Sequence, residues 1–102
     1  HKLDARGVEI NTAAWSEAVG ARARDTALRK VTDAARLARK LGLDVHAGHG
    51  LDYRNVGPVA ALTEISELNI GHAIVARAVL VGMERATREM VEAMRAARGG
   101  RV

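Results

Sequence analysis

Residues Leu41–Gly50 read L-G-L-D-V-H-A-G-H-G, and this stretch decides the fold class. A glycine directly behind an amphipathic segment is typical of a helix end, and the short apolar run after it is typical of a strand. Two glycines and a histidine follow, which indicates a turn at the carboxyl end of that strand, read as Leu43–Ala47. This order of elements predicts one unit of a parallel α/β fold.

Upstream of this stretch, the sequence predicts one helix and one strand. Residues 25–41 repeat apolar side chains at steps of three and four, so we expect an amphipathic helix with Asp25 as its N-cap and Gly42 just past its end. Residues 8–12 begin with β-branched side chains and end with polar ones, which predicts a short strand. Residues His1–Asp4 look like the tail of a further helix, so we expect the chain to begin within a larger unit.

Downstream, a second and a third unit follow. Asn55 and Pro58 predict the start of a short helix, and residues 68–70 predict a third strand. One long helix is expected from Ala73 to the glycine pair at Gly99. We therefore expect a single domain over residues 1–102, with about three parallel strands joined by helical crossovers.

Composition narrows the class of protein. The chain has 102 residues, no cysteine, and only Trp15 and Tyr53 as aromatic residues. No apolar run has the length of a membrane span and no signal-peptide pattern precedes the domain, so we expect a cytoplasmic protein without a membrane partner. The net charge is +4, but the arginines are spread along helices among acidic residues and base-stacking aromatics are scarce, so we expect no nucleic-acid partner.

The carboxyl ends of parallel strands lie at one edge of a sheet, and ligands bind there. Each predicted strand ends in polar or glycine residues, which are Glu9, Asn11 and Thr12, then His46, His49 and Gly50, then Asn69, Gly71 and His72. Gly71 and His72 precede a long helix, where free backbone N–H groups favour an anion, although a simple turn is an equally good reading of a glycine-histidine pair.

The histidines allow several readings. His49 lies between two glycines on a turn, which suits proton transfer near neutral pH, but it could also be a loop histidine without a task. His46 is on the strand itself and is either inward-facing or packed beneath a helix. We expect no metal site at His46, His49 and His72, because the first two diverge in direction and no carboxylate is obviously placed to orient the rings.

Three motifs resemble those of the pyridoxine 5′-phosphate synthase family. They are A-G-H-G-L-D-Y-R-N-V (Ala47–Val56), E-L-N-I-G-H-A-I-V-A-R-A-V (Glu67–Val79) and V-E-I-N-T-A (Val8–Ala13). The resemblance covers nearly the whole chain but only the C-terminal part of the family. It implies the last portion of a (β/α)8 TIM barrel, about three strands of an incomplete barrel that takes roughly 250 residues when closed.

The resemblance also implies a reaction and its residues. The family condenses 3-amino-2-oxopropyl phosphate with 1-deoxy-D-xylulose 5-phosphate to pyridoxine 5′-phosphate, phosphate and water, in the biosynthesis of vitamin B6. It uses no metal or organic cofactor and assembles as an octamer, so a homo-oligomer is implied here. By the resemblance, His49 is the proton donor, Glu9 stabilises the transition state, and Gly50, Gly71 and His72 hold the phosphate of the amino-ketone.

The chain departs from the family in two places and in length. Asn11-Thr12-Ala13 replaces the family's usual His-Thr-Gly, and Leu62-Thr63 replaces its Ile-Pro. The family's catalytic histidine and glutamate on earlier strands have no counterpart, so we expect a fragment that is inactive alone. The alternative is a non-catalytic half-barrel module that self-associates through its unpaired strand edges.

Overall fold

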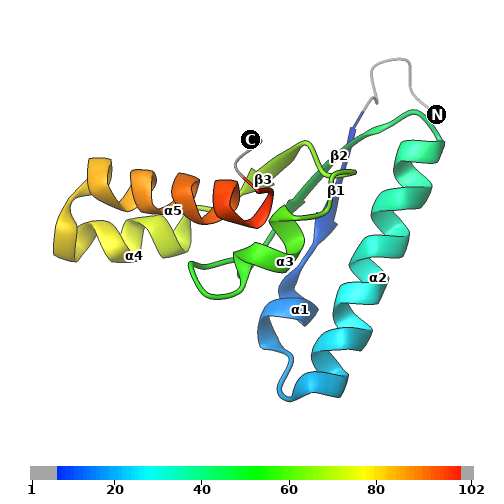
Figure 1. The fold of residues 1–102 in the computed structure, drawn as a ribbon, viewed down its shortest axis with the longest axis horizontal. Coiled ribbons are helices and arrows are strands. Elements are labelled where there is room, and N and C mark those ends of the chain that lie inside the picture. Colours follow the sequence, from blue (N-terminus) through cyan, green and yellow to red (C-terminus); the bar gives the residue numbers. More distant parts are fainter. Residues whose placement is uncertain (1–6, 100–102) are drawn as a thin grey trace.

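A computed structural model describes residues 7–99 of the chain. The expected helix tail at His1–Asp4 lies outside the described residues. Three parallel strands form one sheet in the order β1 (Gly7–Asn11), β2 (Asp44–Gly48), β3 (Glu67–Asn69). Each strand agrees with its predicted range to within one residue, and Figure 1 shows helices following each strand.

Five helices complete the described part of the chain: α1 (Ala13–Glu17), α2 (Ala21–Lys40), α3 (Val56–Ala60), α4 (His72–Val81) and α5 (Met83–Ala97). The first of these, α1, was not predicted, since five residues are too few to show a helical repeat. It buries Trp15, whose indole Nε1 donates to the carbonyl oxygen of Asn55 at 2.9 Å. The bond attaches α1 to the start of α3.

Helix α2 is longer than the sequence predicted at its amino end. It begins at Ala21 and not after Asp25, because Gly20 adopts a φ of 91° and its carbonyl accepts the N–H of Arg24 at 3.1 Å. The other end agrees with the prediction: Gly42 has a φ of 82°, and its N–H donates to the carbonyl of Arg39 at 2.9 Å. A glycine in this left-handed conformation is a common helix terminator.

The prediction of one long helix from Ala73 was wrong. Gly82 breaks it, with φ 90° and ψ 155°, into α4 and α5. Glycine adopts this backbone conformation readily because it has no Cβ, so the chain can turn there. The two helices then lie side by side as a hairpin that extends away from the sheet (Figure 1).

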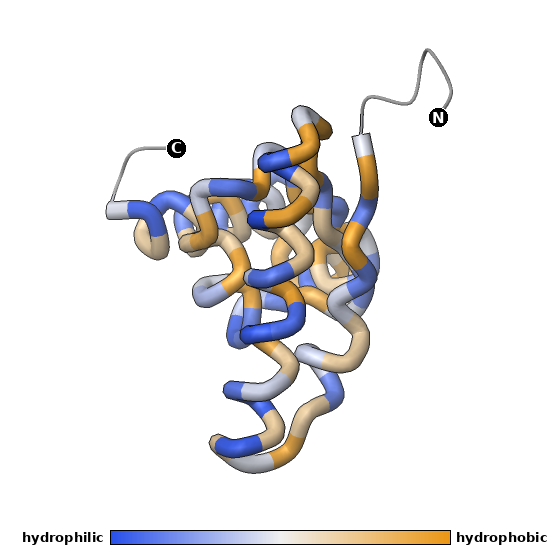
Figure 2. Tube along the Cα trace, turned by 90° about the vertical axis from the view of Figure 1, so that its right-hand side faces the viewer, coloured by the Kyte–Doolittle hydropathy of each residue, from blue (hydrophilic) through white to orange (hydrophobic). Residues whose placement is uncertain are grey.

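The core lies between one face of the sheet and the helices. Val45 and Ala47 of β2 are fully buried against α2, which contributes Val31 and Ala35. Burying a valine side chain contributes roughly 1.5–3 kcal/mol relative to leaving it exposed. Apolar and polar residues alternate along β1, which begins at the end of the grey N-terminal trace in Figure 2, and its Val8 and Ile10 pack against this core.

The opposite face of the sheet is polar and, within residues 7–99, has no helix over it. The side chains of Glu9, His46 and Glu67 are neighbours across the three strands on this face. In the same part of the chain, β1 and β3 each have one unpaired edge. Residues 7–99 therefore form an open α/β unit. None of their helices combines the length and apolarity needed to cross a membrane.

Candidate functional site

A pocket of about 380 Å³ lies at the carboxyl ends of the three strands. The five residues to which the family resemblance gives roles all line it, and they are Glu9, His49, Gly50, Gly71 and His72. Three other strand-end candidates do not line it, and they are Asn11, Thr12 and His46. The pocket is completed by Leu51, Asp52, Asn69, Ile70 and Ala73. Residues from three separate stretches of sequence, one at the end of each strand, thus meet in one place, as the strand order predicted.

His49 lies at this edge in a strained conformation. Its φ is 97°, and it is the one non-glycine residue with a positive φ in residues 7–99. Such a conformation costs about 1–3 kcal/mol, and it persists only where the surroundings fix it. Here Thr12, which is fully buried, donates its hydroxyl to the carbonyl oxygen of His49 at 2.7 Å. The N–H of Thr12 also donates to the carbonyl of Gly48 at 2.8 Å, so the residue that directly follows β1 fixes the turn by two hydrogen bonds.

Gly50 is required by space as well as by conformation. Its φ is 75°, and a Cβ at this position would lie 2.1 Å from the hydroxyl oxygen of Ser16. The carbonyl of Gly50 accepts the side-chain amide of Asn55 at 3.1 Å. Asn55 is at the N-cap position of α3 as predicted, but its side chain bonds the preceding loop and not the first turn of the helix.

Asp52 and Asn55 fix that loop by reciprocal hydrogen bonds. The N–H of Asp52 donates to Oδ1 of Asn55 at 2.8 Å, and the N–H of Asn55 donates to Oδ1 of Asp52 at 2.8 Å. The same Asp52 oxygen accepts the N–H of Arg54 at 2.8 Å. The carboxylate of Asp52 thus organises the segment between the His49 turn and α3.

Gly71 and His72 lie at the start of α4, as the sequence predicted. Gly71 occupies the N-cap position, and its carbonyl accepts the N–H of Val75 at 2.9 Å. The first turn carries no acidic residue, and no side chain of the described residues caps it. A Cβ at Gly71 would meet no atom within 4 Å, so the backbone is open on this side. Free N–H groups at a helix start, together with the helix dipole, favour an anion here.

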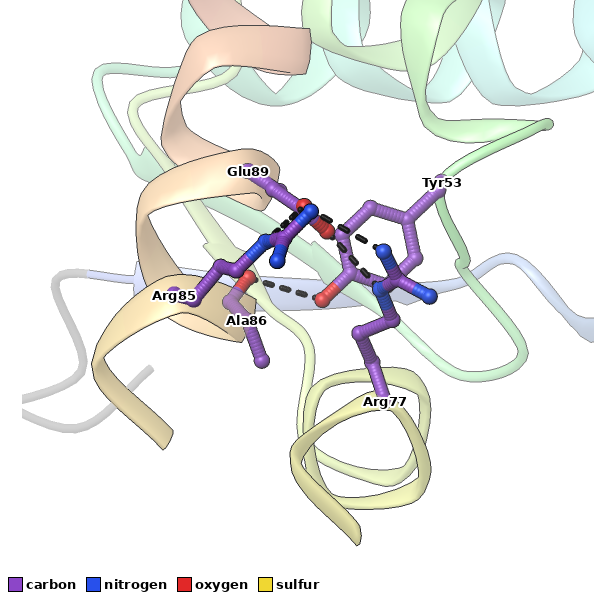
Figure 3. Close-up of polar contacts among 5 residues, drawn as sticks. All are labelled: Tyr53, Arg77, Arg85, Ala86 and Glu89. Atoms are coloured by element: carbon purple, nitrogen blue, oxygen red, sulfur yellow. Dashed lines mark hydrogen bonds and ion pairs between the residues drawn. The ribbon is translucent and has the colours of Figure 1, made fainter. Parts of the chain in front are cut away.

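Helix α4 packs mainly against α5, and none of its side chains is fully buried. Arg77 of α4 forms two hydrogen bonds to the carboxylate of Glu89 on α5, at 2.9 and 3.3 Å, and Arg85 adds a third at 3.1 Å (Figure 3). The hydroxyl of Tyr53, in the segment after β2, donates to the carbonyl of Ala86 at 2.7 Å (Figure 3). These contacts join the helix start to the segment that carries His49.

The contact between Arg77 and Glu89 shifts the pKa of both side chains. The hydrogen bond from Arg77 is the main cause that lowers the pKa of the Glu89 carboxyl below its ordinary value, and the bond from Arg85 adds to it. In turn, the hydrogen bond to Glu89 raises the pKa of Arg77. Arg77 and Glu89 therefore remain charged at neutral pH.

His46 is not packed beneath a helix of residues 7–99, which was one of the two readings that the sequence allowed. It lies on the same face as Glu9, away from α2, and its Nε2 is 3.7 Å from Oε1 of Glu67. It does not line the pocket with His49 and His72. No group of three or more histidine, aspartate or glutamate side chains suited to a metal ion occurs in the part of the chain that the structure describes.

Sequence reasoning missed the supporting roles of three residues. Asn69 lies two residues after Glu67 on β3, so it faces the same side of the sheet as Glu67 and Glu9. The side-chain period of two along a strand could have revealed this. Asp52 stands three residues before Asn55, a spacing typical of reciprocal capping. No pattern in the sequence indicates that Thr12 bonds a residue 37 positions away.

The three parallel strands define an α/β protein. Its candidate ligand site lies at the carboxyl edge of the sheet, where a histidine, a carboxylate and an open helix start line one pocket. Residues 1–96 match the family model described as pyridoxal phosphate biosynthesis protein PdxJ, and the chain belongs to this family.

Similar proteins carry the name pyridoxine 5′-phosphate synthase. The protein of that name from Syntrophotalea carbinolica is 54% identical over 90 residues, which are 88% of this chain and 38% of that protein. The Syntrophobacter fumaroxidans protein is 53% identical over 91 residues, or 89% of this chain and 38% of that protein. The Synechococcus protein is 52% identical over 93 residues, or 91% of this chain and 39% of that protein. The chain thus spans about two fifths of the length of these curated relatives.

Proposed function

We propose that this chain is the C-terminal portion of a pyridoxine 5′-phosphate synthase, which condenses 3-amino-2-oxopropyl phosphate with 1-deoxy-D-xylulose 5-phosphate and releases phosphate and water. The observation that carries the proposal is the meeting of Glu9, His49, Gly50, Gly71 and His72 in one pocket. Membership of the PdxJ family supports the pathway, which leads to pyridoxal phosphate.

The phosphate of the amino-ketone binds at the start of α4 in this proposal. Residues of the first turn line the pocket, Gly71 lets the phosphate approach the backbone N–H groups, and His72 adds a side-chain donor. Gly50 faces the same pocket from the β2 side. Hydrogen bonds to charged groups contribute about 1.5–3 kcal/mol each, so two or three of them support millimolar to micromolar binding.

His49 and Glu9 perform the proton transfers and the charge stabilisation. Imine formation and dehydration need protons delivered to and removed from several atoms of one bound intermediate, and an imidazole does both near neutral pH. The strained turn at His49 holds the ring at the pocket. Glu9 places a carboxylate where positive charge develops on the amino-ketone nitrogen, which stabilises the transition state.

The remaining groups come from outside this chain. We propose that the open sheet is part of a (β/α)8 barrel, that no metal or organic cofactor takes part, and that the barrels form a homo-oligomer. The two free strand edges in residues 7–99 and the relatives' greater length support this. The departure at Asn11 is compatible with the site, because its Oδ1 accepts the N–H of Ala13 at 2.8 Å and so supports the start of α1.

The phosphate site is tested by calorimetry with inorganic phosphate on the purified chain. Gly71→Val fills the open space beside the helix start, and we expect at least tenfold weaker binding with little loss of stability, because no neighbouring atom is displaced. His72→Ala removes one donor and should weaken binding about tenfold. His46→Ala, on the same sheet but outside the pocket, is the matched control and should bind phosphate like the parent chain.

Unchanged affinity in both pocket variants would contradict the phosphate site. A steady-state assay for pyridoxine 5′-phosphate on the purified chain should show no turnover, since groups on further strands are needed. Robust product formation would contradict that part of the proposal.

A non-catalytic, self-associating half-barrel is the second candidate. It is favoured by the apolar residues that α4 exposes, Val75, Val79 and Leu80, which are 55, 82 and 77% exposed. Sedimentation equilibrium distinguishes the two. Self-association that persists while phosphate binding is absent would favour this second candidate.

A further inference from the structure

Gly48, the last residue of β2, lies directly beneath the carboxylate of Glu9. A Cβ built on Gly48 would be 2.6 Å from Oε2 of Glu9, a separation that real Cβ atoms essentially never show. In the strand register Glu9 is opposite His46, two residues before Gly48. The side chain of Glu9 therefore extends across β2 toward the carboxyl edge of the sheet, through the space that a side chain at position 48 would occupy.

Backbone conformation does not explain the glycine. Gly48 is not among the residues with a positive φ, so an alanine could adopt its backbone angles. A glycine inside a strand also costs stability, roughly 0.5–1 kcal/mol relative to alanine. Gly7, on the same face of β1, makes a useful comparison, because a Cβ there would meet its nearest atom at an ordinary 3.4 Å. What distinguishes Gly48 is the close approach of the Glu9 carboxylate.

We propose that Gly48 is a positioning residue, and that its missing side chain lets the Glu9 carboxylate reach the pocket at the strand ends. Glu9 and the start of α4 line the same pocket, so a ligand with its phosphate at Gly71 and His72 can present a cationic amine to Glu9. This inference rests on the proposed function for the identity of the ligand, and on the structure alone for the position of the carboxylate.

An alanine at position 48 should displace the carboxylate without unfolding the chain. The conflict at 2.6 Å is with the end of a flexible side chain, which can rotate away. The remaining close contacts are with Cβ and the carbonyl oxygen of Asn69, both at 3.1 Å, and they require shifts of a few tenths of an ångström. Gly48→Ala is therefore expected to alter the position of Glu9 much more than it alters the fold.

The test compares two probes in calorimetry, inorganic phosphate and O-phosphoethanolamine, which has the same phosphate with an ammonium group attached. The parent chain should bind O-phosphoethanolamine about tenfold more tightly, the increment of one charge-assisted hydrogen bond. Gly48→Ala and Glu9→Gln should each abolish that preference and leave phosphate affinity within about twofold. The double variant should lose nothing further, and Gly7→Ala should keep the preference.

A readout without ligand separates this inference from the proposed function. The ¹³C chemical shift of the Glu9 carboxyl carbon should change in Gly48→Ala and change much less in Gly7→Ala. If the parent chain binds neither probe but the shift changes as expected, the proposed function fails and the positioning by Gly48 stands. An unchanged carboxyl shift overturns the inference. So does a preference for O-phosphoethanolamine that survives in Gly48→Ala, or an equal loss of affinity for both probes.

Discussion

Replacing Thr12 by valine tests whether a buried hydroxyl holds the His49 turn in place. Thr12 is 0% exposed, and its Oγ1 donates to the carbonyl oxygen of His49 at 2.7 Å. Valine has nearly the same shape, so the change removes the donor and leaves the packing almost intact. The carbonyl of His49 then loses its hydrogen bond at a residue whose φ is 97°.

The expected loss of stability follows from that one bond. Leaving a buried acceptor without its partner costs about 1–3 kcal/mol, a large part of the roughly 5–15 kcal/mol that stabilises a typical domain. For a domain of this size each kcal/mol lowers Tm by about 4–8 °C. The strain at His49 favours relaxation of the turn once the bond is gone, so phosphate affinity should also fall several-fold.

Urea unfolding followed by the fluorescence of Trp15, the only tryptophan of the chain and a buried one, measures the free energy of unfolding. Thr12→Ser is the matched control, because it keeps the hydroxyl and loses one methyl group, at a cost of about 1 kcal/mol. The serine variant should bind phosphate like the parent chain. A valine variant with the parent's stability and phosphate affinity would refute the reasoning.

Three further outcomes are expected. Because the folded-state pKa of Glu89 is lowered from its ordinary value of 4.5, its contribution to stability is fully present above that value and is lost as the pH falls through the lower folded-state pKa. Glu89→Gln should therefore flatten the acid limb of a plot of stability against pH, and an unaltered limb would exclude the Arg77 pair as its cause. Arg98, the C-cap residue of α5, donates to the carbonyls of Ala60, Leu62 and Ile65, so Arg98→Ala should cost about 2–4 kcal/mol in urea unfolding. Arg95→Ala in the exposed last turn of α5 is the control and should cost less than about 0.5 kcal/mol, and equal costs would count against these bonds. Gly50→Ala should abolish phosphate binding and lower Tm, since its Cβ would clash with the hydroxyl oxygen of Ser16. A stable variant that binds phosphate like the parent chain would disprove that constraint.

The strands were predicted well because their signals are local. Alternating side chains between turn residues fix β1, β2 and β3 to within a residue, and parallel order follows from the intervening helices. The break at Gly82 was missed, because a glycine within a helical pattern costs only about 1 kcal/mol and packing decides whether the helix continues. The same limit applies to the start of α2, where Gly20 and not Asp25 sets the first turn.

The site could be predicted only in part. The pocket residues were identified together because parallel strands bring their carboxyl ends to one edge, whatever lies between them in the sequence. The roles of Thr12 and Gly48 depend on the register between β1 and β2, which places each beside a residue of a distant segment. The sequence contains the residues but not that register.

The most direct test of the phosphate site is a titration of the ¹⁵N-labelled chain with inorganic phosphate, followed by amide chemical shifts. The account predicts that the amide signals of Gly50, Gly71 and His72 shift together along one saturating curve. The signal of Gly42, which precedes the amino end of β2 and lies outside the pocket, should stay unchanged. Amides at the start of α4 that do not move, or shifts spread evenly over the basic helices, would contradict the central claim.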